Sequence, residues 1–198
     1  MLVEGNLGPV GVNGDATTIV ALGTNNVDSS KSVTSGIKNN VFVEGAEALQ
    51  ILDGGNATTQ ENMSVTETTI FGTGMFGSNS VVVTYEDINF TEFETGRLAN
   101  AYTVFHSNPS IPFVGALSLN DDFSNAGMTV RVSVDSNSAL NLSMFNQTSA
   151  AGVLFVSATG GTFNPASPTP PDGTEVVSFT SGQNSTVGYE GFYSVTLL

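Results

Sequence analysis

The sequence predicts an all-β protein, an antiparallel sandwich of the jelly-roll type with about ten short strands and little or no helix. Apolar and polar residues alternate in short runs, most clearly in residues 128–134, where every second residue is apolar. Gly, Asn, Asp, Ser or Pro, the residues that favour turns, bound each run. Helical periodicity is confined to one short stretch, residues 45–52, so the crossover helices of a parallel α/β fold are missing.

The expected strands follow one another at short intervals along the chain. They are residues 16–22, 40–44, 63–71, 80–90, 101–106, 111–119, 128–134, 140–145, 153–159, 175–180 and 189–198. A chain of 198 residues can bury a full core without a metal or a disulfide, so residues 16–198 are expected to form a single β-sandwich domain. The sequence shows no internal repeat with a period of about 20–50 residues. Four of the seven prolines lie in residues 164–173, which predicts an exposed loop within that domain.

The first fifteen residues differ from the rest because they are rich in glycine, with isolated apolar side chains between the glycines. Residues 1–15 are therefore expected to form an extended arm that pairs with the sheet edge of a neighbouring molecule. The side chains expected to dock are Leu2, Val3, Leu7, Val10 and Val12. A frayed terminus is the alternative, because chain ends are commonly loose unless something ties them down.

Charge and composition exclude several classes of function. The chain has 18 acidic and 4 basic residues, a net charge of −14, so nucleic acids and anionic bilayers are repelled and no direct nucleic-acid binding is expected. It has no cysteine, which removes thiol chemistry and thiolate metal sites. Residues 1–30 contain no long apolar run, so we expect neither a signal peptide nor membrane insertion. Either Met1 is the native start or a leader has been removed.

Two patterns that suggest catalysis are weak in this chain. Residues 72–77 match the glycine pattern of dinucleotide-binding loops, but a further strand follows where the motif needs a helix to hold the pyrophosphate, which predicts a hairpin loop. His106 is the only histidine, so a Ser-His-Asp, Cys-His or multi-histidine zinc site lacks its partners. A structural or solvated histidine at a strand end is expected, and no catalytic residue is predicted.

Acidic residues raise two further ideas. A carboxylate pair for glycoside hydrolysis is disfavoured, because such sites need a sugar cleft with aromatic platforms and the chain has no tryptophan. Calcium is the one cofactor that the loops suggest, with Asn120, Asp121 and Asp122 as the candidate oxygen ligands. The alternative is that these are solvated turn residues, since turns select Asp and Asn for other reasons.

These observations predict a structural, self-assembling virion protein, such as a capsid decoration, outer coat or tail-tube subunit at the virion surface or tail. Its partners are expected to be copies of itself or another structural protein of the same assembly. One alternative is an extracellular filament or pilus subunit joined by β-strand exchange at a cell surface. A second is a carbohydrate-binding β-sandwich module, whose aromatic platform would be formed by Tyr85, Tyr102, Tyr189 or Tyr193.

Overall fold

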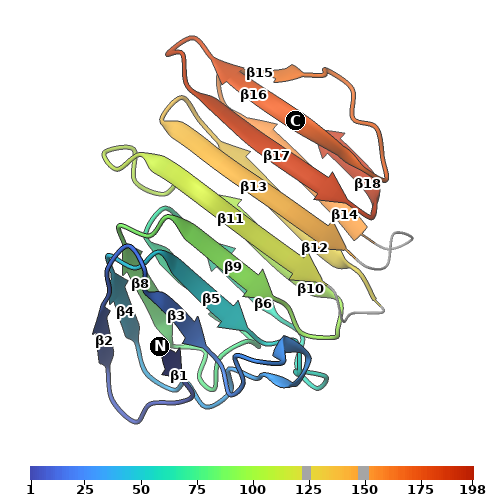
Figure 1. The fold of residues 1–198 in the computed structure, drawn as a ribbon. Helices are drawn as coiled ribbons and strands as arrows, with labels where there is room; N and C mark the ends of the chain where they lie inside the picture. The colour runs from blue at the N-terminus through green and yellow to red at the C-terminus, as the bar shows by residue number, and fades with distance from the viewer. Residues whose placement is uncertain (122–125, 147–151) are drawn as a thin grey trace.

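The computed structural model describes residues 1–121, 126–146 and 152–198 and consists of two nine-stranded sheets that face each other (Figure 1). In this part of the chain there is no α-helix, and a 3-10 turn forms at Ser29–Lys31. The stretch 45–52, the one place where the sequence allows a short helical turn, ends in a strand at residues 48–52. The prediction of an all-β protein is confirmed.

Both sheets are built from short strands. Sheet 1 runs in the order β1 (Leu2–Val3), β3 (Ile19–Leu22), β5 (Ala48–Leu52), β9 (Phe90–Glu94), β11 (Phe113–Asp121), β13 (Ser138–Asn146), β17 (Asn184–Glu190), β16 (Gly173–Phe179) and β15 (Gly161–Asn164). Sheet 2 runs in the order β18 (Phe192–Leu197), β14 (Gly152–Ala158), β12 (Met128–Val134), β10 (Asn100–Phe105), β6 (Asn62–Val65), β7 (Thr69–Thr73), β8 (Val82–Glu86), β4 (Val41–Glu44) and β2 (Val10–Asn13).

The chain crosses from one sheet to the other almost every time a strand ends, and each crossing completes half of a coil. Strands from successive coils then lie side by side and pair in parallel, as β9, β11 and β13 do in sheet 1 and β10, β12 and β14 do in sheet 2. Among the described residues, antiparallel pairing is confined to β6–β7–β8 and to β15–β16–β17. The molecule is thus a flattened parallel β-solenoid.

The expected antiparallel jelly roll is therefore corrected, because most strand pairs are parallel. Alternation of apolar and polar residues indicates that a strand is half buried, but it does not indicate whether the strand runs parallel or antiparallel to its neighbours. Parallel strands need a long crossover connection, and a helix was expected to supply it. Here the crossover is a strand of the opposite sheet, which the sequence presents as just another short alternating run.

The coils repeat in space although the sequence shows no repeat. Thr129 pairs with Ala101 on one side and with Val153 on the other, which lie 28 and 24 residues away along the chain. The next coil is longer, since Val153 pairs with Ser194, 41 residues further on. Loops and the β15–β16 hairpin account for the variable length. A search for a fixed period therefore finds nothing.

Residues 1–15 lie against this chain's own sheets instead of standing apart as an arm. β1 pairs with β3 and β2 pairs with β4, and the side chains of Val3 and Val12 are buried. Of the side chains expected to dock on a neighbour, Leu7 is 95% exposed, whereas Leu2 and Val10 are half buried. These residues are the first coil of the solenoid, and pairing of their outer edges with another molecule stays a prediction.

Buried asparagines hold the turns between the sheets. Asn100, at the start of β10, is 1% exposed; its side-chain oxygen accepts the backbone N–H of Glu61 at 3.0 Å and its amide donates to the carbonyl of Gly96 at 2.8 Å. Asn146, at the end of β13, likewise accepts from the N–H of Met128 and donates to the carbonyl of Gly191. Each asparagine satisfies backbone groups that water does not reach.

Replacing Asn100 by alanine is expected to lower the free energy of unfolding by about 2 kcal/mol or more, because two backbone groups lose their partners and each costs about 1–3 kcal/mol. Urea denaturation followed by circular dichroism measures this loss. Asn141→Ala is the matched control, since Asn141 lies exposed on the outer face of β13. Equal stability of the two variants would contradict the role given to Asn100.

Candidate functional site

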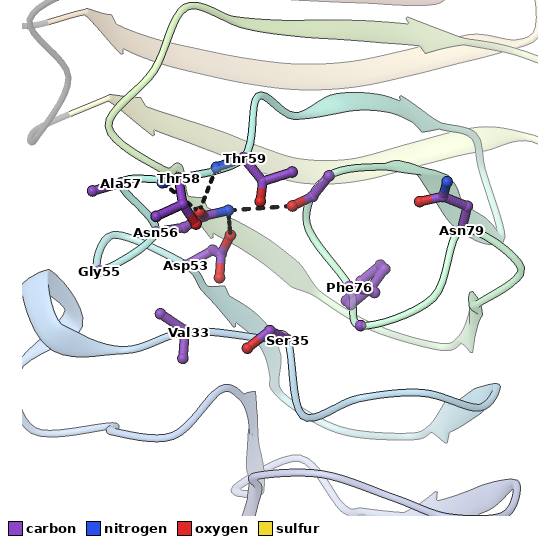
Figure 2. A pocket seen from close by; sticks show the side chains of 12 residues that line it. Val33, Ser35, Asp53, Gly55, Asn56, Ala57, Thr58, Thr59, Phe76 and Asn79 are labelled. Carbon is purple, nitrogen blue, oxygen red and sulfur yellow. Dashed lines mark hydrogen bonds between the residues drawn. The ribbon is translucent and has the colours of Figure 1, made fainter.

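A polar cavity of about 370 Å³ lies beside the loops that follow β5 and β7 (Figure 2). Its walls combine hydroxyl, amide and carboxyl side chains with one aromatic ring. It is lined by Val33, Ser35, Asp53, Gly55, Asn56, Ala57, Thr58, Thr59, Gly74, Phe76, Gly77 and Asn79. This mixture of apolar walls and convergent polar groups makes the cavity the first candidate for a ligand site.

The glycine pattern at residues 72–77 forms one side of this cavity. The segment runs from the end of β7 toward β8, which pairs antiparallel with β7, so the expected hairpin is confirmed. Gly74 has a φ of +90°, and a Cβ atom on it would lie 2.0 Å from the carbonyl oxygen of Gln60. The glycines thus allow close backbone packing, and no helix follows that could hold a phosphate.

Two buried carboxyl groups, those of Asp53 and Glu61, lie at or next to the cavity: Asp53 is one of its lining residues, Glu61 is hydrogen-bonded to Asp53, and both residues are 0% exposed. Asp53, just after β5, accepts the Thr34 N–H at 2.7 Å and the Thr34 hydroxyl at 3.0 Å through Oδ1, and the Asn56 amide at 2.8 Å through Oδ2. Glu61, just before β6, accepts the Gly96 N–H at 2.6 Å and the hydroxyl of Tyr102.

Burial raises the pKa of both carboxyl groups, because the charged forms lose their hydration. The charge of Asp53 raises the pKa of Glu61 further, to well above its ordinary value. A side-chain hydrogen bond joins the two residues, and it raises the pKa of Glu61 while it lowers that of Asp53. Of the two carboxyl groups, Glu61 is therefore the one that holds a proton more readily.

The carboxyl pair binds together parts of the chain that are distant in sequence. Asp53 connects the loop after β5 to Thr34, and Glu61 connects the start of β6 to Gly96 and to the core tyrosine Tyr102. Because both carboxyl groups are fully buried and are hydrogen-bonded to protein groups, they are placed to stabilise these loops, although Asp53 also borders the cavity. No sequence pattern indicates that Glu61 is buried or functional, and the only indication for Asp53 is that it follows an apolar run.

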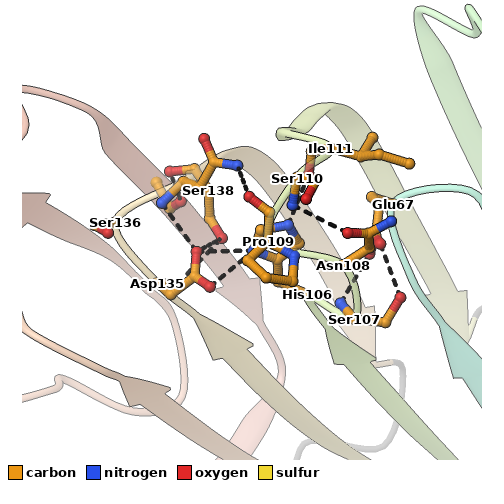
Figure 3. A network of polar contacts seen from close by, with 12 residues as sticks. Glu67, His106, Ser107, Asn108, Pro109, Ser110, Ile111, Asp135, Ser136 and Ser138 are labelled. Carbon is orange, nitrogen blue, oxygen red and sulfur yellow. Dashed lines mark hydrogen bonds and ion pairs between the residues drawn. The ribbon is translucent and has the colours of Figure 1, made fainter.

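His106 and Asp135 form the second polar cluster, at the loops that follow β10 and β12 (Figure 3). Nδ1 of His106 contacts both carboxylate oxygens of Asp135 at 2.8 and 2.9 Å, and Nε2 donates to the carbonyl of Ile111 at 2.7 Å. Burial lowers the pKa of His106, but the Ile111 carbonyl and the Asp135 carboxylate outweigh it and raise the pKa above 6.5. With its side chain only 3% exposed, His106 fastens two loops.

The calcium ligands expected at residues 120–122 are not brought together as a described site. Asn120 and Asp121 are neighbours on β11, so their side chains point to opposite faces of sheet 1, and Asp122 lies outside the described residues. Asn120 donates its amide to Glu92 at 3.2 Å, and the buried Asp121 accepts the hydroxyl of Thr95 at 3.1 Å. Within residues 1–121, 126–146 and 152–198, no group of three or more His, Asp or Glu side chains is placed to hold a metal ion.

The tyrosines expected to form a sugar platform are mostly internal. Tyr85, Tyr102 and Tyr189 are buried in the core, and their hydroxyl groups bond to Thr66, Glu61 and Glu175. Tyr193 alone of the four is exposed, at 70%.

The proton held by Glu61 makes stability depend on pH. The pKa of Glu61 is higher in the folded chain than its ordinary value of 4.5, so its stabilising contribution is complete below about pH 4.5 and is lost as pH rises toward the folded pKa. The free energy of unfolding should therefore fall as pH rises over this range. We expect Glu61→Gln to make that fall smaller, by about 1.4 kcal/mol for each unit by which the pKa of Glu61 differs between the folded and the unfolded chain. Thermal or urea unfolding between pH 4 and 9 measures it, with the exposed Glu44→Gln as control. Parallel curves for both variants would contradict the assignment.

Titration of His106 by NMR is expected to give a pKa above 6.5, because both ring nitrogens face acceptors and the imidazolium is favoured. Asp135→Asn should lower that pKa. Glu67→Gln should lower it less, since Glu67 acts on the ring through charge alone. A His106 pKa that is insensitive to Asp135→Asn would overturn the pairing.

Among the described residues there is no helix that could span a membrane. Comparison of the chain with models of protein families finds no match, and comparisons with curated proteins and with solved structures find none either.

Proposed function

We propose that this chain is a non-catalytic structural subunit that assembles with copies of itself or with another structural protein, as part of a virion or of an extracellular filament. The observation that supports the proposal is the arrangement of the sheet edges. Each sheet ends in two edge strands that run in the same direction, and in the part of the chain that the structure describes each edge strand pairs on one side only.

The strand directions follow from the pairings. In sheet 2, from β18 at one edge to β2 at the other, each neighbouring pair of described strands is parallel except the two pairs that involve β7. Two reversals of direction cancel, so β18 and β2 run in the same direction. In sheet 1 the two pairings of β16 are the only antiparallel ones, so β15 and β1 also share a direction. A second molecule placed end to end with the first could therefore continue a sheet with the same parallel pairing that operates inside it.

Backbone groups for such pairing are present on both edges of sheet 2. The N–H groups of Val10 and Gly14 donate to the carbonyls of Asn40 and Glu44 beside β2, so the alternate residue Gly11 directs its N–H away from β4. At the other end, Leu198 bonds to Val156, so the alternate residue Leu197 directs its backbone groups away from β14. Unpaired edge groups of this kind are templates for strand addition.

Pairing of β18 on one molecule with β2 on the next joins two different surfaces. Such a heterologous contact produces an open filament, or a ring if the rotation closes. Both outcomes suit a tail-tube or coat subunit, and the open filament suits an extracellular fibre. The edge strands supply the contact that was expected of a free arm at residues 1–15, with β2 as one of the two partners.

The non-catalytic part of the proposal rests on how the reactive side chains are engaged. His106 contacts Asp135 and Ile111, and Asp53 and Glu61 are buried among protein donors. Among the described residues, the side chains best suited to acid–base chemistry, those of His106, Asp53 and Glu61, are thus hydrogen-bonded to protein groups that connect loops.

The test uses the mass of the full chain in solution, measured by light scattering and sedimentation over a wide concentration range, with electron microscopy of any polymer. Gly11→Pro removes the outward N–H of β2 without removing a bond to β4, and we expect it to abolish or strongly reduce assembly. Gly11→Ala is the control, because the added Cβ has no atom within 4 Å and the N–H is kept. A chain that stays monomeric at every concentration, or equal assembly of both variants, would count against the proposal.

A further inference from the structure

The outer face of sheet 2 over β10, β12 and β14 differs in charge from the rest of the molecule. Its outward side chains, which alternate with buried ones, are Ala101, Thr103, Phe105, Thr129, Arg131, Ser133, Val153, Phe155 and Ser157. None is acidic and one is basic, in a chain with a net charge of −14. The outer face of sheet 1, in contrast, carries Glu92, Glu94 and Glu190.

Arg131 lies at the centre of this face with its charge uncompensated. Its guanidinium carbon lies 5.0 Å from the centre of the Phe155 ring, and within the described residues no carboxylate forms an ion pair with it. Two of the other three cations differ: Lys31 pairs with Asp28 at 2.6 Å, and Arg97 donates to the carbonyls of Gly54 and Ser30. Lys38 is exposed and, like Arg131, forms no ion pair within the described residues, but it lies outside this face. The ring restrains the guanidinium and leaves its N–H groups available.

A groove of about 450 Å³ surrounds this arginine and is open toward solvent. Its walls are mostly apolar, with hydroxyl groups at the border; it is lined by Thr103, Arg131, Val132, Ser133, Phe155, Ser157 and Leu198. The hydroxyls of Thr103 and Ser133 make no hydrogen bond within the described part of the chain, whereas Ser157 donates to the carbonyl of Val132 at 3.3 Å. The groove thus offers a cation, an apolar surface and free hydroxyls.

We propose that this groove binds an acidic carbohydrate, a sugar unit that carries a carboxylate. The carboxylate accepts N–H groups of Arg131, which can bind it with two parallel hydrogen bonds. The C–H face of the sugar ring packs on the apolar surface beside Phe155 and Leu198, and its hydroxyls bond to Thr103 and Ser133. This binding site goes beyond the proposed assembly and does not rest on it, because the groove uses the face of sheet 2 and assembly uses its edges.

An acidic peptide fits this face less well than a sugar does. Peptides commonly bind sheets by adding a strand to a free edge, but β12 is paired on both sides, with β10 and β14. The hydroxyl side chains that border the groove suit a ligand with many hydroxyl groups of its own. A fatty acid is disfavoured because an open groove leaves most of an alkyl chain in water.

The experiment is a calorimetric or NMR titration of the full chain with trigalacturonate, in parallel with neutral maltotriose, acetate and a tetraglutamate peptide. We expect binding of trigalacturonate that weakens with salt, and little or none of the other three. Arg131→Gln should weaken it roughly tenfold to a hundredfold, since a hydrogen bond to a charged group is lost. Lys38→Gln is the matched control, because it removes one exposed positive charge elsewhere and should leave the affinity unchanged.

Arg131→Lys is the second variant; it keeps the charge, and its loss of the planar fork should give an intermediate affinity. Circular dichroism of each variant checks that the fold is kept. Three results would overturn the proposal: no binding of trigalacturonate, binding of acetate or of the peptide as tight as that of trigalacturonate, or a loss of affinity in Lys38→Gln as large as in Arg131→Gln. Arg131 would then serve only to cover Phe155.

Discussion

Parallel backbone pairing between successive coils is the constraint on which this structure depends. Most coils contribute one strand to each sheet, and the strands of the next coil pair with them in register, as Leu117 does with Leu142 and Leu142 with Val187. Because side chains alternate along a strand, register between coils also aligns the inward residues of both sheets into continuous apolar rows. A slip by one residue would send a whole row to the solvent face. The backbone ladder and the core therefore stabilise the same arrangement.

A solenoid of this kind has to turn the chain at every change of sheet, and its turns carry buried polar groups. Side-chain amides and carboxyls fill that role, as Asn100 and Asn146 do at strand ends and as Asp53 and Glu61 do at the loops around β6. The abundance of asparagine, which the composition suggests only as a turn preference, has this internal use as well. The acid pair shows that a buried carboxyl can be kept by sharing a proton and by accepting backbone N–H groups.

The two outer faces and the two ends of the molecule are left for interaction. The faces differ in charge, since Arg131 lies on a face without acidic residues and Glu92 and Glu94 lie on the other. The ends differ from the faces because they are formed by edge strands, whose backbone groups have a neighbouring strand on one side only within the described residues. The assembly and the ligand binding that we propose therefore use different surfaces, and neither involves the buried polar clusters.

The sequence by itself determined the all-β class and the hairpin at residues 72–77, because strand alternation and turn residues are local signals. It also placed several strands closely, as at β12. Tertiary structure alone decided that the strands pair in parallel and that residues 1–15 form the first coil, since direction and partner depend on crossings of variable length. It likewise decided the candidate sites. Asp53 and Glu61, or Arg131 and Phe155, become neighbours only when coils stack, while Asn120 and Asp121, adjacent in sequence, are separated by the alternation of β11.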